Sequence, residues 1–399
     1  MRSSIWRLPG VRPLVTTTMA GFCGYAVLIP VAPSWARVGG AGTGGSGLVN
    51  GVLLLFTVLT QLSVPRALRR FGWGPVLTAG LLLLGVPGAA YAASDALGPV
   101  LVLSAVRGAG FGVLTVTGSS AVAALVGPER RGEAIGVYGL AVALPGLLLL
   151  PAGPWIAGRV GFWVVFAISA LPVAGIPAAL RLARELRETS PVQVPLTGPS
   201  STGEPAPAAY RSLLRPAVLL TSVTAAGGAA VTFVPQMTRG DLLGAAGLFV
   251  MGVVTAVARW RAGPLADRYG AQRFLWPLLL VAAAGTALLA WSVLDGQRTN
   301  VGLFLAAAAV LGVGYGALQN LTLVVAFAAV SRRHQHLASS VWNVGFDGGT
   351  ALGSVAVGLI AAGTSFSVAF LVAACLVLAV LPLAVVRSPR LRPARPCDR

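Results

Sequence analysis

Apolar stretches long enough to cross a lipid bilayer recur along this chain of 399 residues. A membrane-spanning helix needs about 20 largely apolar residues, because each adds ~1.5 Å and the hydrocarbon core is ~30 Å thick. Hydrophobic residues make up 56% of the chain and the mean hydropathy is +0.83. Charged residues are only 10%, whereas soluble domains carry about 25%. The chain therefore requires a bilayer as its solvent, and a soluble fold is excluded.

Arginine clusters and Gly/Pro punctuation divide these stretches into twelve expected spans. They cover residues 13–36, 47–65, 75–94, 99–126, 133–153, 161–181, 213–235, 243–261, 274–293, 300–330, 338–361 and 365–386. The sequence thus predicts an all-α integral membrane protein with twelve transmembrane helices. In lipid, each backbone polar group of a single span must find its partner inside that span, and the α-helix achieves this.

The basic residues predict the orientation of these spans. All 29 are arginines, against 11 acids. With twelve spans, 24 arginines fall on the side that holds both termini, four on the other side, and Arg107 falls inside a span. Because arginine accumulates in cytoplasmic loops, we expect both termini to be cytoplasmic. The net charge of +18 then reflects topology and requires no nucleic-acid partner.

Two similar halves are expected on either side of a polar segment rich in Pro, Ser, Gly and Thr. Arg70-Phe71-Gly72 matches Arg268-Tyr269-Gly270 at an offset of 198, and the glycines at 108, 110 and 112 match those at 312, 314 and 316 at an offset of 204. Six spans repeated around a central linker are typical of secondary transporters. The expected divisions are a first half at 1–183, a cytoplasmic linker at 184–212, a second half at 213–386 and an arginine-rich tail at 387–399.

The repeated loop carries a family resemblance. The segment from Gly263 to Gly270 (GPLADRYG) resembles the GxLADRxG loop of the major facilitator superfamily. In the first half Arg69 stands where this loop has its aspartate, and Arg107 with its following glycines is an altered form of the RxxxGxG pattern of drug/proton antiporters. The resemblance covers essentially the whole chain. It implies the major facilitator fold, with spans 1, 2, 4, 5, 7, 8, 10 and 11 around a central cavity.

The same resemblance assigns a cytoplasmic gate to the repeated loop. The residues assigned to it are Gly263, Asp267, Arg268, Gly270, Arg70 and Gly72. Asp267 is expected to latch the halves by contacting the positive end of the fifth span or Arg130 and Arg131. The alternative is a surface carboxylate in a tight turn.

Polar side chains gather in the spans that the resemblance places around the cavity, where water or partners offset their cost in hydrocarbon. The candidate pathway residues are Tyr25, Asn50, Gln61, Thr115, Tyr315, Gln319, Asn320, Asn343 and Thr350. Hydrogen bonding between helices is an equally good explanation for several of them.

Asp347 is the one acid well inside an expected span. Ser339, Asn343, Asp347, Thr350 and Ser354 follow at spacings that place them on one helical face. Asp347 and Arg107 both fall near the middle of the membrane, roughly 14 Å and 12 Å from their span ends. Either the carboxyl exchanges a proton in competition with Arg107 or the substrate, or the two residues form a permanent ion pair or are satisfied by polar neighbours.

These features favour a secondary active transporter that exports a small amphipathic compound in exchange for protons. The alternatives are a proton-coupled nutrient symporter and a transporter-like sensor that binds without transport. No nucleophile–base or metal-ligand cluster supports an enzyme, and His334 and His336 are explained by a solvated basic loop better than by a metal. We expect a monomer that needs no cofactor. Its expected partners are the lipid bilayer, a small-molecule substrate and protons. The arginine-only, Ala/Gly-rich composition suggests a GC-rich bacterial genome, and hence a bacterial plasma membrane.

Overall fold

The computed structural model describes residue 6 and residues 8–125, 131–189, 206–238, 241–293, 299–330 and 335–385. Helices joined by short connections make up these residues, and no strand occurs among them. Twelve helical spans in this part of the chain are long and apolar enough to cross a membrane. The predicted all-helical membrane fold with twelve spans is confirmed.

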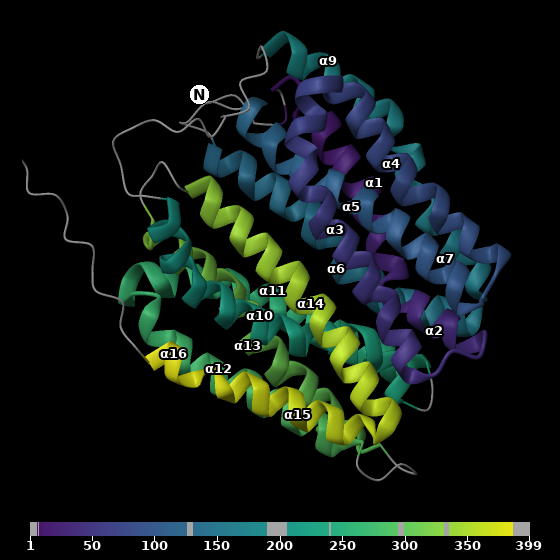
Figure 1. Cartoon of the computed structure of the whole chain (residues 1–399), viewed down its shortest axis with the longest axis vertical. Coiled ribbons are helices and arrows are strands. Elements are labelled where there is room, and N and C mark those ends of the chain that lie inside the picture. The colour runs from purple at the N-terminus through teal and green to yellow at the C-terminus, as the bar shows by residue number, and fades with distance from the viewer. Residues whose placement is uncertain are drawn as a thin grey trace, which may run out of the picture.

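The first six spans form one bundle, drawn in purple to teal in Figure 1. Their elements are α1 (Val11–Leu28), α2 (Val31–Val38), α3 (Thr43–Phe71), α4 (Trp73–Ala90), the short helix η2 (Tyr91–Ala93), α5 (Leu97–Leu125), α6 (Arg131–Arg159), α7 (Phe162–Ser169), α8 (Leu171–Ala174) and α9 (Ile176–Thr189). The first span combines α1 with α2, and the sixth combines α7, α8 and α9.

The last six spans form a second bundle, drawn in teal to yellow, and α14 lies beside α3 of the first (Figure 1). Their elements are α10 (Ala206–Met237), α11 (Asp241–Tyr269), α12 (Gln272–Ser292), α13 (Val301–Ala328), α14 (Gln335–Gly363), α15 (Phe366–Ala379) and α16 (Leu381–Val385). The two bundles contact each other most extensively where α3 packs against α14 and where α6 packs against α11.

Some helix ends differ from the expected ones. The eighth span was expected to end at residue 261, but α11 continues to Tyr269. The loop motif is therefore helical from Gly263 to Tyr269, and Arg259 and Arg261 lie within the span. Helices also cover both ends of the expected linker, because α9 runs to Thr189 and α10 begins at Ala206. The middle of the linker and the tail at 387–399 lie outside the described residues.

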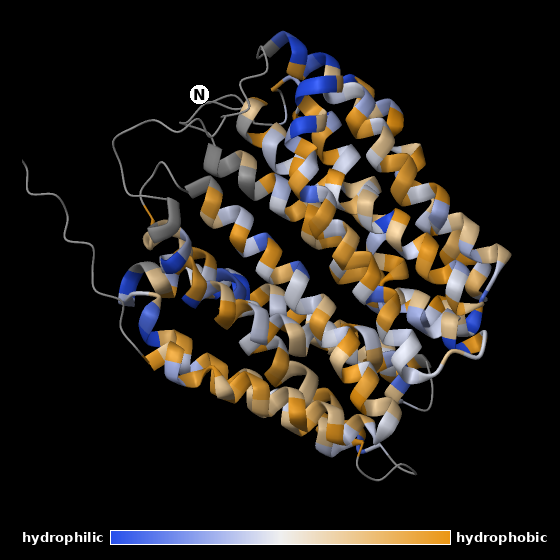
Figure 2. Ribbon diagram, in the orientation of Figure 1, coloured by the Kyte–Doolittle hydropathy of each residue, from blue (hydrophilic) through white to orange (hydrophobic). Residues whose placement is uncertain are grey.

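The alternation of the spans gives the bundle two sides. Val11, Phe71 and Val385 lie at what we call the terminal side, and Val38, Thr43 and Gly363 lie at the distal side. Figure 2 shows hydrophilic residues gathered mainly at the helix ends, while hydrophobic residues cover their middle portions. This distribution suits helices that cross a hydrocarbon core.

The expected sequence repeat appears as a repeat of helix contacts. A side-chain carbon added to Gly110 would lie 2.5 Å from Leu84 N, where α5 crosses α4. One added to Gly314 would lie 2.7 Å from Ala282 N, where α13 crosses α12. Leu84 and Ala282 are separated by the same 198 residues as the repeated loops. Glycine recurs at these positions because the backbones approach closely, as in other membrane helix pairs.

We predict that Gly314→Ala destabilises the second bundle. The new methyl group would lie 2.6 Å from Ala282 Cβ, so α12 and α13 would have to separate. Overpacking of this kind costs about 1–3 kcal/mol. Thermal unfolding of the purified protein in detergent should show a lower Tm.

Gly348→Ala is the matched control. Gly348 also lies in a membrane-spanning helix, but an added carbon there meets no atom within 4 Å. We expect its Tm to match or slightly exceed the native value, since alanine favours helix over glycine. Equal Tm values for the two variants would contradict the packing explanation.

Candidate transport pathway

Asp347 lies at the contact between the two halves. It belongs to α14, is 7% exposed, and its Oδ2 accepts a hydrogen bond of 2.9 Å from Gln61 Nε2 on α3. Gln61 Nε2 also donates to Thr115 Oγ1 on α5, at 3.2 Å. An amide nitrogen has two hydrogens and can make both bonds. Three of the predicted residues, from three helices and both halves, therefore form one connected group.

Both ends of this contact are near the middle of the membrane. Asp347 is ten residues from the start of its span at Leu337, and Gln61 is ten residues from the end of its span at Phe71. Each is therefore about 15 Å from the terminal side by the helical rise. This depth agrees with the depth expected from the sequence.

Arg107 is completely buried and faces the interior of the first half. Its Nη2 donates to Gly24 O on α1 at 3.2 Å, and its guanidinium carbon lies 5.7 Å from the ring centre of Tyr91. No protein group among the described residues accepts from its Nε or Nη1. The buried cation is thus only partly satisfied in this arrangement.

The structure does not bring Arg107 and Asp347 together as an ion pair. Arg107 contacts α1 and the end of the third span, whereas Asp347 contacts α3. The helical rise placed the two residues correctly in depth, but it carries no information on the direction of each side chain around its helix. The hypothesis of a permanent ion pair is not supported in this arrangement.

Arg259 is a cation at the site that the sequence interpretation missed, because it was counted among the arginines of the terminal side although it falls within the expected eighth span at 243–261. Its Nη1 donates to Gln319 Oε1 at 3.2 Å, and its carbonyl oxygen accepts from Asn320 Nδ2 at 2.9 Å. It lies seven residues inside the span that ends at Ala266, about 10 Å from that end. Two of the predicted pathway residues therefore contact Arg259, Gln319 at its guanidinium and Asn320 at its backbone.

The repeat offers a signal that would have found Arg259. Adding the offset of 198 to Gln61 gives Arg259, and adding the offset of 204 to Thr115 gives Gln319. The corresponding pairs both form hydrogen bonds, Gln61 to Thr115 in the first half and Arg259 to Gln319 in the second. The second half therefore repeats a hydrogen bond of the first half at equivalent positions.

Two tyrosines lie within electrostatic range of the charged groups. The Tyr25 hydroxyl is within electrostatic range of Arg107, Asp347 and Tyr315, and the Tyr315 hydroxyl is within range of Arg259 and Asp347. The Tyr25 ring stacks on Phe111, with ring centres 3.6 Å apart. Both predicted tyrosines therefore lie in the same region as Asp347.

Asn50 forms a contact between the two halves. Its Nδ2 donates to Ile29 O at 3.0 Å and to Thr232 Oγ1 of the other half at 2.9 Å. Thr232 Oγ1 is 2.9 Å from Ser354 Oγ. Asn50, Thr232 and Ser354 are buried, and their hydrogen bonds join the two halves at this level. The role of Asn50 in the pathway stays a prediction.

Further hydrogen bonds join the halves closer to the distal side. Gln236 Oε1 accepts from Arg37 Nη1 at 3.1 Å and from Ser46 Oγ at 3.3 Å. Together with the Asn50 contact they hold the first two spans against α10. The distal end of the interface is closed by this set, which we call the distal cluster.

The remaining predicted pathway residues make local contacts. Thr350 Oγ1 donates to Phe346 O at 2.9 Å, and Asn343 Nδ2 donates to Ser339 O at 2.9 Å, both within α14. Asn343 is exposed, whereas Asp347 on the same helical face is buried. Among the described residues, no side chain of another helix forms a hydrogen bond with Thr350 Oγ1, so its role in the pathway stays a prediction.

Each of the two repeated loops ends its helix at a glycine with positive φ. Gly72 and Gly270 both have positive φ values, 76° and 83°. Their N–H groups bond to Leu68 O at 2.9 Å and to Ala266 O at 2.8 Å, which ends each helix with a left-handed glycine. Arg70 and Arg268 lie over the rings of the aromatic residues that follow them. The sequence match therefore reflects a shared helix termination.

The expected latch falls outside what the structure describes. The side chains of Asp267 and Arg131 and the whole of Arg130 are among the undescribed groups. The same holds for His334 and the side chain of His336. Gly263 is described, and a carbon added to it would lie 3.7 Å from Asn320 Nδ2. The gate assignment stays a prediction.

A comparison with known families decides what kind of protein this is. The family model of the Major Facilitator Superfamily matches residues 14–299 and 247–398. The chain belongs to the major facilitator superfamily. No curated protein sequence matches this member of the superfamily.

Solved transporters share its fold. One is a bacterial homolog of the human lysosomal transporter Spinster in an inward-facing, occupied conformation, with 13% identity, 94% of this chain and 95% of that chain covered, and a TM-score of 0.68. Another is a POT family transporter in complex with 5-aminolevulinic acid, with 11% identity, coverage of 94% and 95%, and a TM-score of 0.79. A third is a peptide transporter POT mutant in complex with alafosfalin, with 15% identity, coverage of 96% for both chains, and a TM-score of 0.76. At these identities the likeness shows the fold of this superfamily member and not its substrate.

Proposed function

We propose that this superfamily member is a secondary active transporter that exports a small amphipathic organic compound in exchange for protons. The observation that carries the proposal is the hydrogen bond between Asp347 and Gln61 across the two halves. An ionised carboxylate only accepts hydrogen bonds, whereas a protonated one can also donate. Proton uptake at Asp347 therefore changes a contact on which the relative position of the halves depends.

The burial of Asp347 makes the contact between the halves more sensitive to its charge. A carboxylate removed from water is costly unless it is well paired, and the bond to a neutral amide is weaker than a bond to a cation. The charged form of Asp347 should favour a conformation in which the halves separate and water reaches it. In alternating access, the protonated form would then allow the closed contact.

The central groups suit a solute with one polar end. Asp347 and Arg259 are the acidic and basic residues in range of Tyr315, and the other candidate pathway groups are neutral amides, hydroxyls and rings. A sugar requires many hydrogen-bond partners, whereas an amphipathic compound requires few polar groups and an apolar wall. We further propose that Asp267 latches the two halves at the cytoplasmic side, and that the protein is a monomer in a bacterial plasma membrane.

A second candidate is uptake of a small zwitterion together with protons. Arg259 and Asp347 carry opposite charges and act on the same tyrosine, so they offer partners for a carboxylate and an ammonium group. The solved POT family transporters hold 5-aminolevulinic acid in one case and alafosfalin in another. In the uptake proposal, the substrate's ammonium group would bind to the Asp347 carboxylate, which binds a proton in the export proposal.

The direction of proton coupling distinguishes these functions. We first identify a ligand by thermal shift of the purified protein against a compound panel, because binding to the folded state raises its stability. In proteoliposomes, an exporter that exchanges protons should accumulate the ligand when the lumen is acidic. A symporter should accumulate it when the outside is acidic.

Two controls make this test decisive. Liposomes without protein report passive permeation, and an ionophore that collapses the pH gradient should abolish accumulation in either direction. Saturable binding with no flux under either gradient would overturn both transport proposals and identify a sensor.

A further inference from the structure

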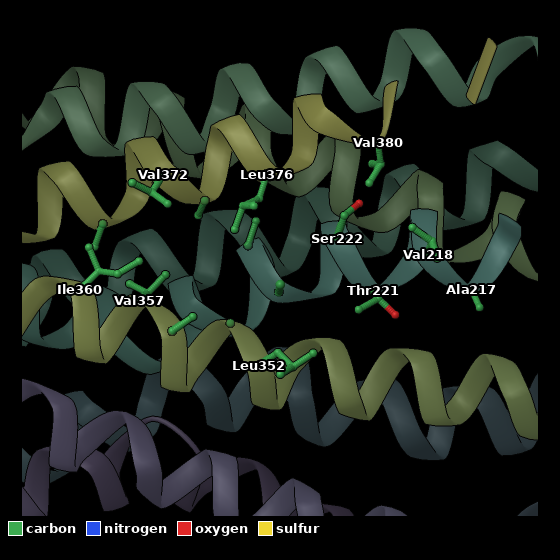
Figure 3. Close-up of a pocket in the computed structure, with 16 residues that line it drawn as sticks. Ala217, Val218, Thr221, Ser222, Leu352, Val357, Ile360, Val372, Leu376 and Val380 are labelled. Atoms are coloured by element: carbon green, nitrogen blue, oxygen red, sulfur yellow. The ribbon is translucent and has the colours of Figure 1, made fainter. Parts of the chain in front are cut away.

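A groove of about 370 Å³ lies on the second half, between α10, α14 and α15. Figure 3 shows Leu352, Val357 and Ile360 on one wall facing Val372 and Leu376 on the other. Leu352 and Leu376 are 63% and 57% exposed, so the groove opens onto the surface of the bundle. This surface is distinct from the central group around Asp347.

The chemistry of the walls selects an apolar occupant. Only two lining side chains carry a hydroxyl group, Thr221 and Ser222. Thr221 Oγ1 donates to Gly345 O at 3.2 Å, and Ser222 Oγ donates to Leu219 O at 2.9 Å. Both hydroxyl protons are therefore engaged with backbone carbonyls, and the groove presents hydrocarbon to whatever enters it.

The groove has the length of one lipid leaflet. Its lining residues on the last span extend from Ala369 in α15 to Val380, directly after that helix, about 17 Å by the helical rise. Half of a hydrocarbon core is ~15 Å thick. Val380 lies five residues from the end of the span at Val385, so one end of the groove is close to the terminal side of the membrane.

Basic residues continue the line of the groove at this end. Arg211, Arg215, Val218 and Ser222 follow along α10 at spacings that place them on one helical face. Arg211 is exposed, and Arg215 Nε donates to Leu383 O at 2.8 Å. This bond holds the Arg215 charge between α10 and the end of the last span, next to the mouth of the groove.

We propose that this groove binds an acyl chain of an anionic phospholipid from the leaflet on the terminal side, with the lipid phosphate beside Arg211 and Arg215. An apolar chain fills the hydrocarbon walls, and the two guanidinium groups supply the complementary charge for the head group. The site is separate from the proposed transport pathway and does not depend on which compound is transported.

The test is a titration of the purified full-length protein by native mass spectrometry. The probes are phosphatidylglycerol and phosphatidylcholine, each with one palmitoyl and one oleoyl chain. Since an interfacial arginine contributes about fivefold to anionic lipid binding, we expect phosphatidylglycerol to bind roughly 25-fold more tightly. Arg211→Gln combined with Arg215→Gln should remove this preference.

The apolar half of the site is tested by Ala356→Phe. Ala356 is an exposed lining residue, so the ring fills the groove without entering the core. We expect binding of phosphatidylglycerol to fall at least tenfold. Ala284→Phe, at an exposed position on α12 outside the groove, is the matched control and should bind normally.

Several outcomes would overturn the proposal. These are equal binding of the two lipids by the native protein, an unchanged preference in the double glutamine variant, or equal losses in Ala356→Phe and Ala284→Phe. A native dimer that Ala356→Phe converts to a monomer would identify the groove as a contact between copies. Thermal unfolding of each variant shows whether it is folded before the lipid titration is interpreted.

Discussion

Asp347→Asn is expected to abolish pH-driven accumulation of substrate while exchange of substrate across the membrane continues. Asparagine keeps the size of the side chain and can still accept from Gln61 Nε2, the bond that is 2.9 Å long in the native protein. It cannot take up or release a proton. The contact between the halves therefore remains, but its strength no longer depends on pH.

The expected loss is large. With a gradient of about two pH units and one proton moved per uncharged substrate, the accumulation ratio approaches ~100, because each pH unit is worth about 1.36 kcal/mol. The asparagine variant should reach a ratio near one. Substrate concentration inside proteoliposomes, measured at steady state with the gradient held, gives this ratio directly.

Two variants serve as controls for this result. Asp347→Glu retains a titratable carboxyl on α14 and should keep part of the accumulation. Asp95→Asn removes a carboxylate from the short connection between the third and fourth spans and should leave the ratio unchanged. Accumulation by Asp347→Asn at the native level would show that another group carries the proton.

The number and position of the spans could be predicted because lipid restricts the backbone so strongly. Long apolar runs had few alternatives to helix, and the structure places a span at each of the twelve expected ranges. The end of the eighth span was wrong because polar and basic residues do not stop a helix at a membrane surface. The α11 helix ends where Gly270 adopts a positive φ, and not where hydropathy falls.

The central group could be predicted only in part. Depth in the membrane follows from counting residues along a helix, and it placed Asp347 and Arg107 at similar levels. Which helix each side chain contacts depends on how neighbouring helices rotate and cross. The bond between Gln61 and Asp347, the burial of Arg107 against α1, and the position of Asn50 in the distal cluster all depend on that packing.

The internal repeat contained more information than the paired loops revealed. The same offsets relate Thr57, which donates to Gly108 O at 3.1 Å, to Thr255, which donates to Gly312 O at 3.3 Å. Contacts within each half are therefore repeated. Asp347 has no acidic counterpart, because the offset of 204 leads back to Ala143. The two halves share a framework, and the difference between them lies at the proposed proton site.

Arg107→Met is expected to raise thermal stability while it lowers transport at least tenfold. The guanidinium is fully buried, with one hydrogen bond to Gly24 O at 3.2 Å. Its Nε and Nη1 find no acceptor among the described residues, and an unsatisfied buried donor costs about 1–3 kcal/mol. Replacing a buried charge with an apolar side chain of similar volume is often neutral or stabilising.

A buried arginine that destabilises this conformation has a function if its guanidinium forms more hydrogen bonds in another conformation of the cycle. We infer that Arg107 gains acceptors when the two halves change their relative position, so that methionine would hold the protein in the present arrangement. Ser104→Ala is the matched control one helical turn away. Ser104 Oγ already donates to Val100 O at 2.8 Å and lies 2.7 Å from Tyr91 Oη, so its loss should lower Tm slightly and leave transport intact. If Arg107→Met lowered Tm while transport remained at the native rate, Arg107 would be a packing residue of the first half and would have no part in the cycle.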